Sequence, residues 1–150
     1  MLGNRRSIRL RGYDYTRPAA YFLTLCVKNR ECLFGEIAAG KMQLNEFGRI
    51  VSKMWRWMET QYPYVDLDAY VVMPDHFHGI LWIVDGPRRG DSPLRLSTQT
   101  IQTMKQKRWV WQRNYYERII RNDTELIRIQ GYIDANPARW LYDVNNSKIG

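Results

Sequence analysis

The chain has 150 residues, 45% of them apolar, which allows one compact domain with a substantial core and excludes a disordered sequence. Its 23 Lys and Arg residues outnumber 15 Asp and Glu residues, and the net charge of +8 favours a polyanionic partner such as nucleic acid over a merely soluble basic domain. Two cysteines without a CxxC spacing give no support to a zinc ribbon or a thioredoxin-like site. No apolar run is long enough to span a bilayer, and no signal peptide is evident, so we predict a cytoplasmic protein.

The N-terminal half predicts an arm, a strand, a hairpin and a helix. We interpret residues 1–150 as a single domain in which the basic, aromatic residues 1–17 form an arm. Residues 19–27 are rich in strand-forming side chains, and the glycine-punctuated residues 32–44 suggest a short hairpin. A helix capped by Asn45 follows, and its apolar stripe consists of Phe47, Ile50, Val51, Met54, Trp55 and Met58.

Two strands come next, over residues 65–73 and 76–84. Pro74 cannot donate to a central ladder, so a turn, bulge or edge is expected between them. Residues 85–98 read as a loop rich in glycine, proline and charge, and a second helix is predicted over 98–107.

The C-terminal part predicts one more strand and a final helix. Residues 109–121 are aromatic and basic and suggest a strand leading into a turn. Asn122 and Glu125 resemble a capping box, and Pro137 is expected to bias the preceding residue away from helical geometry. The element order predicts an α+β, ferredoxin-like fold: an antiparallel sheet with helices on one face and an added C-terminal helix.

His76 and His78, the only histidines in the chain, lie two residues apart in an otherwise apolar strand. Alternation along a strand puts both on one face, about 7 Å apart, with Phe77 on the other. Such a pair can converge on one divalent cation, although a third ligand must then come from elsewhere. Two hydrogen-bonded, partly buried histidines are the alternative interpretation.

Tyr132 and Asn136 lie four residues apart, on one face of the last helix. Both fall at the edge of an apolar stripe made by Leu126, Ile129 and Ile133, which places a phenol and an amide over the sheet. Asn136 could supply the missing oxygen ligand, and Tyr132 could reach a substrate held by the metal. The alternative is an amphipathic tyrosine at the core edge with a C-terminal asparagine cap.

Five stretches resemble the REP-associated tyrosine transposases, a branch of the single-tyrosine HUH transposase family. They are RRSIRLRGYDYT, YFLTLCVKNRECLFGEI, VVMPDHFHGILWI, WQRNYYERIIRND and YIDANPARW, and they cover most of the chain. The HUH motif is the triplet from His76 to His78. In this family the two histidines bind a divalent metal, a later helix carries the nucleophilic tyrosine, and a metal-binding amide follows one turn on. The resemblance implies that Tyr132 is the nucleophile and Asn136 the amide ligand.

The chemistry that the resemblance implies is cleavage of single-stranded DNA beside a hairpin, with a 5′-phosphotyrosine intermediate, a free 3′-OH and later rejoining. The cofactor would be Mg²⁺ or Mn²⁺, of which histidine ligands suit Mn²⁺ better. The active form would be a monomer or a homodimer. Two departures stand out, because Asp75 replaces the Asn of MPNH and residues 85–108 look short for the family.

Binding to a single strand is predicted to rest on cations that follow phosphates and rings that stack on bases. The candidates are Arg5, Arg6, Arg9, Arg11, Lys105, Lys107, Arg108, Trp109, Trp111, Arg113, Tyr115, Tyr116, Arg118 and Arg121. The alternative is that Trp109 and Trp111 belong to the core and that the charges form a solvated face.

Three other functions remain open from the sequence. A catalytically impaired or domesticated relative would bind nucleic-acid hairpins without cutting them. A metal-dependent hydrolase acting through water would use the same HxH motif. An RNA-binding sheet platform is disfavoured, because no RNP1-like run is present.

Overall fold

The computed structural model describes residues 19–84 and 110–142. At its centre is an antiparallel sheet with the strand order β4-β5-β1-β6. Together with a helix between β1 and β4, this order confirms the predicted ferredoxin-like arrangement. The sheet consists of β1 (Ala19–Cys26), β4 (Val65–Met73), β5 (His76–Ile83) and β6 (Tyr116–Ile120).

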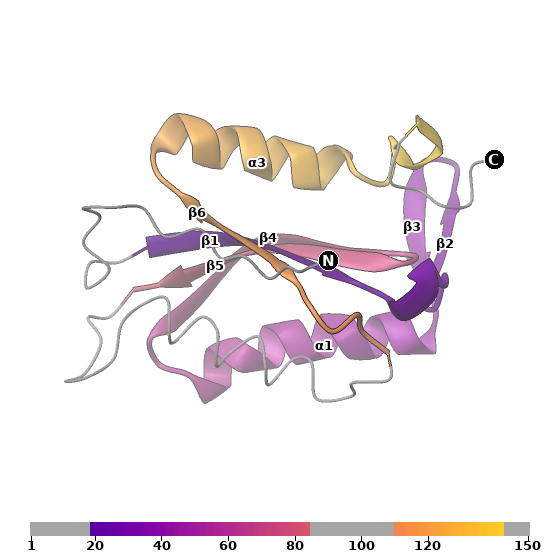
Figure 1. Ribbon diagram of the computed structural model, residues 1–150, viewed down its shortest axis with the longest axis horizontal. Helices are drawn as coiled ribbons and strands as arrows, with labels where there is room; N and C mark the ends of the chain where they lie inside the picture. The colour runs from indigo at the N-terminus through magenta and orange to yellow at the C-terminus, as the bar shows by residue number, and fades with distance from the viewer. Residues whose placement is uncertain (1–18, 85–109, 143–150) are drawn as a thin grey trace.

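The two long helices, α1 (Glu46–Gln61) and α3 (Asp123–Ala135), lie on opposite faces of this sheet (Figure 1). The C-terminal helix is therefore an addition on the face that α1 leaves uncovered. The arm, the loop over 85–98 and the helix predicted over 98–107 lie outside the described residues.

The larger core lies between the sheet and α1. Its inward-facing side chains alternate along the strands, as expected for a pleated sheet, and α1 contributes Val51, Trp55 and Met58. Gly79 is required here by close approach, because a Cβ at that position would lie 2.8 Å from Cη2 of Trp55. The predicted stripe of α1 is too wide, since Phe47 and Ile50 are 43% and 51% exposed.

Side-chain caps begin both helices, as predicted. Asn45 Oδ1 accepts a hydrogen bond of 2.9 Å from the Gly48 amide, and Asn122 Oδ1 accepts one of 2.8 Å from the Glu125 amide. Glu125 reaches back to the amide of Arg121, one residue before the position that a capping box uses.

Two details at the C-terminal end differ from the prediction. The last strand is shorter than 109–121, because β6 covers only Tyr116–Ile120 and Trp111 makes an isolated bridge to Val27. Asn136 keeps helical angles (φ −55°, ψ −48°) despite the following proline, although the regular helix ends at Ala135 as expected.

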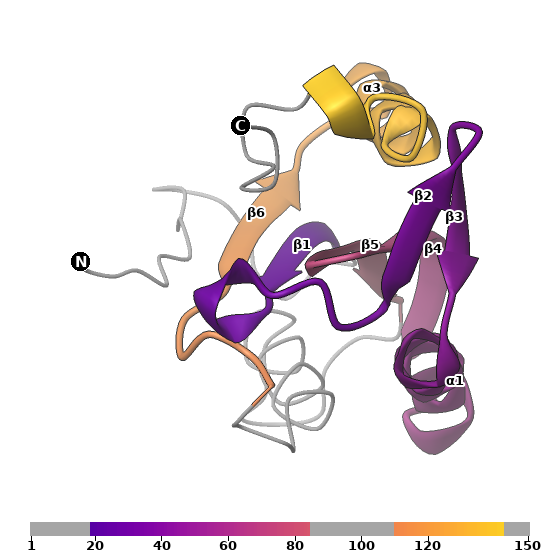
Figure 2. The ribbon, with the colours of Figure 1, turned by 90° about the vertical axis from the view of Figure 1, so that its right-hand side faces the viewer.

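The predicted hairpin is present as a separate two-stranded sheet, β2 (Gly35–Ala38) with β3 (Lys41–Leu44). Figure 2 shows it beside the main sheet, extending from the level of α1 toward α3. Its tip approaches the segment after α3, because a Cβ at Gly40 would lie 3.8 Å from the Cα of Ala138. Within the described ranges, no helix is long and apolar enough to cross a membrane.

Candidate active site

Both histidines point from β5 toward the α3 face of the sheet, as the alternation predicts. Their ring centroids are 4.6 Å apart, and His76 and His78 are only 3% and 6% exposed. Phe77 between them points to the opposite face, where it packs on Trp55 with ring centroids 4.9 Å apart. The strand therefore brings two imidazoles together on one side while it contributes to the core on the other.

Each imidazole is oriented by a hydrogen bond at Nδ1. The His76 nitrogen is 2.7 Å from Oδ1 of Asp75, and the His78 nitrogen is 2.8 Å from Oγ1 of Thr24 on β1. An ionised carboxylate can only accept, so His76 Nδ1 carries the hydrogen and leaves its Nε2 lone pair available. This is the arrangement that commonly supports metal-binding histidines.

The environment keeps His78 uncharged. Its burial, followed by the electrostatic influence of His76 and Arg30, lowers the pKa of His78 to about 3. An uncharged imidazole is the form that binds a metal ion, so His78 is in a ligating state at neutral pH.

Asp75 and Arg30 form a polar pair behind the histidines. Burial alone would raise the pKa of Asp75, but hydrogen bonds from His76 and Arg30 outweigh it and hold that pKa below its usual value. Arg30 Nε lies 3.0 Å from Asp75 Oδ2. Asn29 and Arg30 have φ values of 59° and 53°, the left-handed region, where a residue other than glycine is strained by about 1–3 kcal/mol. The surrounding structure thus holds Arg30 at the site against a local preference.

The placement of Arg30 and the partnership of Asp75 were not predicted from the sequence. In the sequence, Asp75 was noted only as a departure from the family motif. A carboxylate immediately before a histidine pair is nevertheless a recognisable signal for a group that orients an imidazole. Arg30 lies 45 residues before Asp75, and no local pattern links the two.

Tyr132 reaches the histidines from α3. Its ring centroid lies 5.4 Å from that of His78, with 64° between the planes, and 6.2 Å from that of Phe22. Phe22 in turn stacks on His78 at 5.3 Å. Ile129 and Ile133 anchor the same helix in a small buried cluster on this face of the sheet, which fixes the helix that carries the tyrosine.

Asn136 lies one turn after Tyr132 and is 3% exposed. Its Nδ2 donates a 2.9 Å hydrogen bond to the Tyr132 carbonyl oxygen, whereas its buried Oδ1 has no hydrogen-bond partner in the described part of the chain. A buried acceptor left unpaired costs about 1–3 kcal/mol, so this oxygen is a candidate ligand. The described residues contain no group of three His, Cys, Asp or Glu side chains that could hold a metal, so a site here would need the amide.

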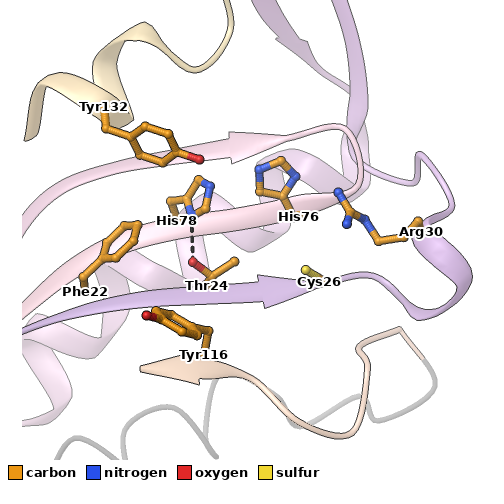
Figure 3. Close-up of a pocket in the computed structure, with 8 residues that line it drawn as sticks. All are labelled: Phe22, Thr24, Cys26, Arg30, His76, His78, Tyr116 and Tyr132. Carbon is orange, nitrogen blue, oxygen red and sulfur yellow. Dashed lines mark hydrogen bonds between the residues drawn. The ribbon is translucent and has the colours of Figure 1, made fainter. Parts of the chain in front are cut away.

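A cavity of about 330 Å³ opens in front of these groups (Figure 3). It brings together both histidines, Tyr132 and Arg30, whereas Asn136 is not among its lining residues. Figure 3 shows the Tyr132 hydroxyl turned toward His78. Tyr116 lies across β1 from that histidine. The lining residues are Phe22, Thr24, Cys26, Arg30, His76, His78, Tyr116 and Tyr132.

The candidates for DNA binding are only partly described. Trp111 and Tyr115 are 4% and 7% exposed and belong to the larger core, so their assignment as stacking rings is corrected. Tyr116 is 47% exposed, and Arg118 pairs with Glu125. Arg113 and Arg121 are exposed, and the remaining candidates, Arg5, Arg6, Arg9, Arg11, Lys105, Lys107, Arg108 and Trp109, lie outside the described residues.

No family model matches the chain, but the chain is similar to other proteins in sequence and to solved structures in fold. An uncharacterized protein of Haemophilus influenzae is 38% identical over 165 aligned residues, covering 93% of this chain and 92% of that protein. Another H. influenzae protein, named "Putative REP-associated tyrosine transposase", is 23% identical over 146 residues, covering 86% and 76%. A solved structure of a REP-associated tyrosine transposase bound to a REP hairpin matches with a TM-score of 0.57 at 20% identity, covering 88% of this chain and 74% of that one. Along most of its length the chain is thus similar in sequence to a putative REP-associated tyrosine transposase, and it shares its fold with a solved structure of such a protein.

Proposed function

We propose that this chain cleaves and rejoins single-stranded DNA beside a hairpin, with Tyr132 as the nucleophile. The observation that carries the proposal is the meeting of Tyr132 from α3 with His76 and His78 from β5 at one cavity. These side chains come from elements far apart in the sequence, and none of them belongs to the two buried apolar clusters.

Cleavage transfers the phosphoryl group from the 3′ oxygen to the Tyr132 oxygen, so one bond forms and one bond breaks. The Tyr132 oxygen forms a bond to the scissile phosphorus, and the bond from that phosphorus to the 3′ oxygen breaks. The phenol loses its proton and the departing 3′ oxygen gains one, so the products are a 5′-phosphotyrosine and a free 3′-OH. Reversal with another 3′-OH rejoins the strand without an external energy source. A phenol has a reference pKa near 10, so Tyr132 needs activation at neutral pH.

The donor set of this site fits a divalent metal ion. His76 and His78 offer supported imidazole nitrogens, and the unpaired Oδ1 of Asn136 offers an oxygen. A Mg²⁺ or Mn²⁺ ion held by these residues would polarise the scissile phosphate, and the nitrogen ligands favour Mn²⁺.

Arg30 supplies the fixed positive charge of the cavity. It is held by Asp75 on one side and lines the cavity on the other, so a phosphate that enters meets a guanidinium whose orientation is already set. A planar guanidinium is well suited to a phosphate, because it can donate two parallel hydrogen bonds.

The partner that we propose is a DNA hairpin with a single-stranded flank. Support comes from the solved relative, which is bound to a REP hairpin.

The decisive experiment incubates the protein and Mn²⁺ with labelled hairpin oligonucleotides from its own genomic neighbourhood and resolves the products on a denaturing gel. We expect a covalent adduct that disappears in Tyr132→Phe, which keeps the ring and removes only the oxygen. Tyr116→Phe is the matched control, because Tyr116 lines the same cavity. Mass spectrometry should find the nucleotide on the peptide that carries Tyr132.

Two outcomes would contradict the assignment. An undiminished adduct in Tyr132→Phe, or a nucleotide mapped to Tyr116, would transfer the nucleophile to another residue. Hairpin binding without any adduct, at every metal concentration, would indicate an impaired relative that only binds DNA.

A further inference from the structure

A second hollow, of about 420 Å³, lies next to the candidate active site on the α3 face. Phe22 and Tyr132 line both cavities, so the tyrosine stands at the boundary between them. Gly131 borders open space on the helix surface, because a Cβ there would meet nothing within 4 Å.

Three arginines from three different segments line this second hollow. Arg118 comes from β6, Arg128 from α3, and Arg139 from the turn after that helix. Arg118 and Arg128 both approach the carboxylate of Glu125, at a distance of 3.7 Å for Arg128. One carboxylate beside three guanidinium groups leaves the hollow positively charged.

Two of these arginines are available to a ligand. The Arg128 side chain is 63% exposed, although it lies beside Glu125. Arg139 is exposed and its Cζ lies 5.9 Å from the centroid of the Tyr132 ring. A solvated helix face would scatter such charges, whereas here they gather around the proposed nucleophile.

We propose that this hollow binds a backbone phosphate of the DNA strand that Tyr132 attacks, so that the strand crosses the tyrosine with one phosphate in each cavity. The proposal rests on the proposed function and adds Arg128 and Arg139 to it as positioning residues. Neither arginine acts on the scissile bond, and their contribution is to hold the single strand across the nucleophile.

The test measures binding of a fluorescent single-stranded oligothymidylate by anisotropy at several salt concentrations, with EDTA present so that metal does not contribute. The variant is Arg128→Gln with Arg139→Gln, while Arg118 is kept because of its pair with Glu125. The matched control is Lys53→Gln with Arg56→Gln, which removes the same charge from exposed positions of α1 on the opposite face.

We expect affinity at low salt to fall about three- to tenfold in the double variant, and the slope of log K against log salt to become shallower by about 0.7 for one lost phosphate. The control should lose much less. Arg139→Lys alone, which retains the charge, should keep the wild-type slope. Thermal unfolding of each variant confirms that the fold is intact.

Equal losses in the variant and the control would overturn the proposal, as would a wild-type protein that does not bind oligothymidylate. The covalent adduct on the hairpin substrate is a separate readout. If wild type forms no adduct but the slopes differ as expected, the proposed function fails and the phosphate site stands. If the adduct forms and the slopes agree, the phosphate site alone is wrong.

Discussion

The two faces of the central sheet are built from the same strands and differ in almost every other respect. Toward α1, the side chains of β1 and β5 join a large apolar core that includes Trp55 and Phe77. Toward α3, the apolar cluster is small, and beside it lie a histidine pair, a tyrosine and a cavity. The face toward α1 is therefore given to apolar packing, and the face toward α3 combines a small apolar cluster with a polar cavity.

This difference shows how a short chain can separate stability from chemistry. Because alternate residues of a strand face opposite sides, β5 contributes Phe77 to the core and its two histidines to the site within three residues. A buried polar group lowers stability unless it is paired, so the site is confined to the face with fewer apolar contacts.

The largest effects on stability and on cleavage should come from substitutions of neighbouring β5 residues that face opposite sides of the sheet. Phe77→Ala should lower the free energy of unfolding by about 3–5 kcal/mol, because it empties a fully buried aromatic position beside Trp55. His78→Ala should abolish adduct formation and change stability by only about 1 kcal/mol, as expected for the loss of one hydrogen bond. Urea denaturation and the gel assay measure the two properties.

If Phe77→Ala and His78→Ala lowered the free energy of unfolding equally, the proposed difference between the two faces would be wrong. Retained cleavage in His78→Ala would remove the histidine pair from the mechanism. Binding of the hairpin by His78→Ala serves as the control for folding.

A smaller effect should come from the partner of His76. Asp75→Asn keeps the shape of the side chain and weakens its hold on the imidazole and on Arg30, so half-maximal cleavage should need about 10- to 100-fold more Mn²⁺. A merely structural role for Asp75 would lower stability without moving the metal dependence. Glu36→Gln, an exposed charge on β2, is the control.

The smallest effect concerns the polar connection between α3 and the sheet. Asp68 on β4 accepts hydrogen bonds of 3.0 Å from Trp82 on β5 and 2.9 Å from Gln130 on α3. Partial burial would raise the pKa of Asp68, but hydrogen bonds from Trp82, Gln130 and Ala69 hold it below its usual value.

A depressed folded-state pKa means that Asp68 stabilises the fold above its unfolded pKa of about 3.9 and that this contribution is lost as the pH falls through the folded value. The difference in unfolding free energy between wild type and Asp68→Asn should therefore be constant above about pH 5 and shrink below about pH 4. Urea denaturation across this range measures it. A difference that grows toward low pH would show that the carboxylate is not stabilised in the folded state.

Local patterns in the sequence were enough for most of the fold. The bounds of β4, the cap at Asn45 and the turn after Met73 follow from residue types that act within a few positions. The shared face of His76 and His78 follows from strand alternation in the same way. These features need no knowledge of distant contacts.

The parts that the sequence did not reveal depend on contacts between distant segments. Arg30 meets Asp75 only because η1 (Lys28–Arg30), the short turn after β1, folds back beside the end of β4. Their basic neighbours made Trp111 and Tyr115 candidates for stacking on bases, with a core position as the alternative for Trp111, and tertiary packing buries both. The second hollow is lined by arginines from β6, α3 and the turn after α3, and no spacing pattern in the sequence predicts that they lie together.

The alternation along β5 also makes an insertion or deletion in this strand differ in its consequences from a substitution. Substitutions at one position alter one face, but the loss or gain of a single residue within His76–Ile83 would exchange the two faces beyond that point. Such a shift would place imidazoles against Trp55 and turn Phe77 into the cavity. A change in the length of β5 is therefore more damaging to the protein than most single substitutions within it.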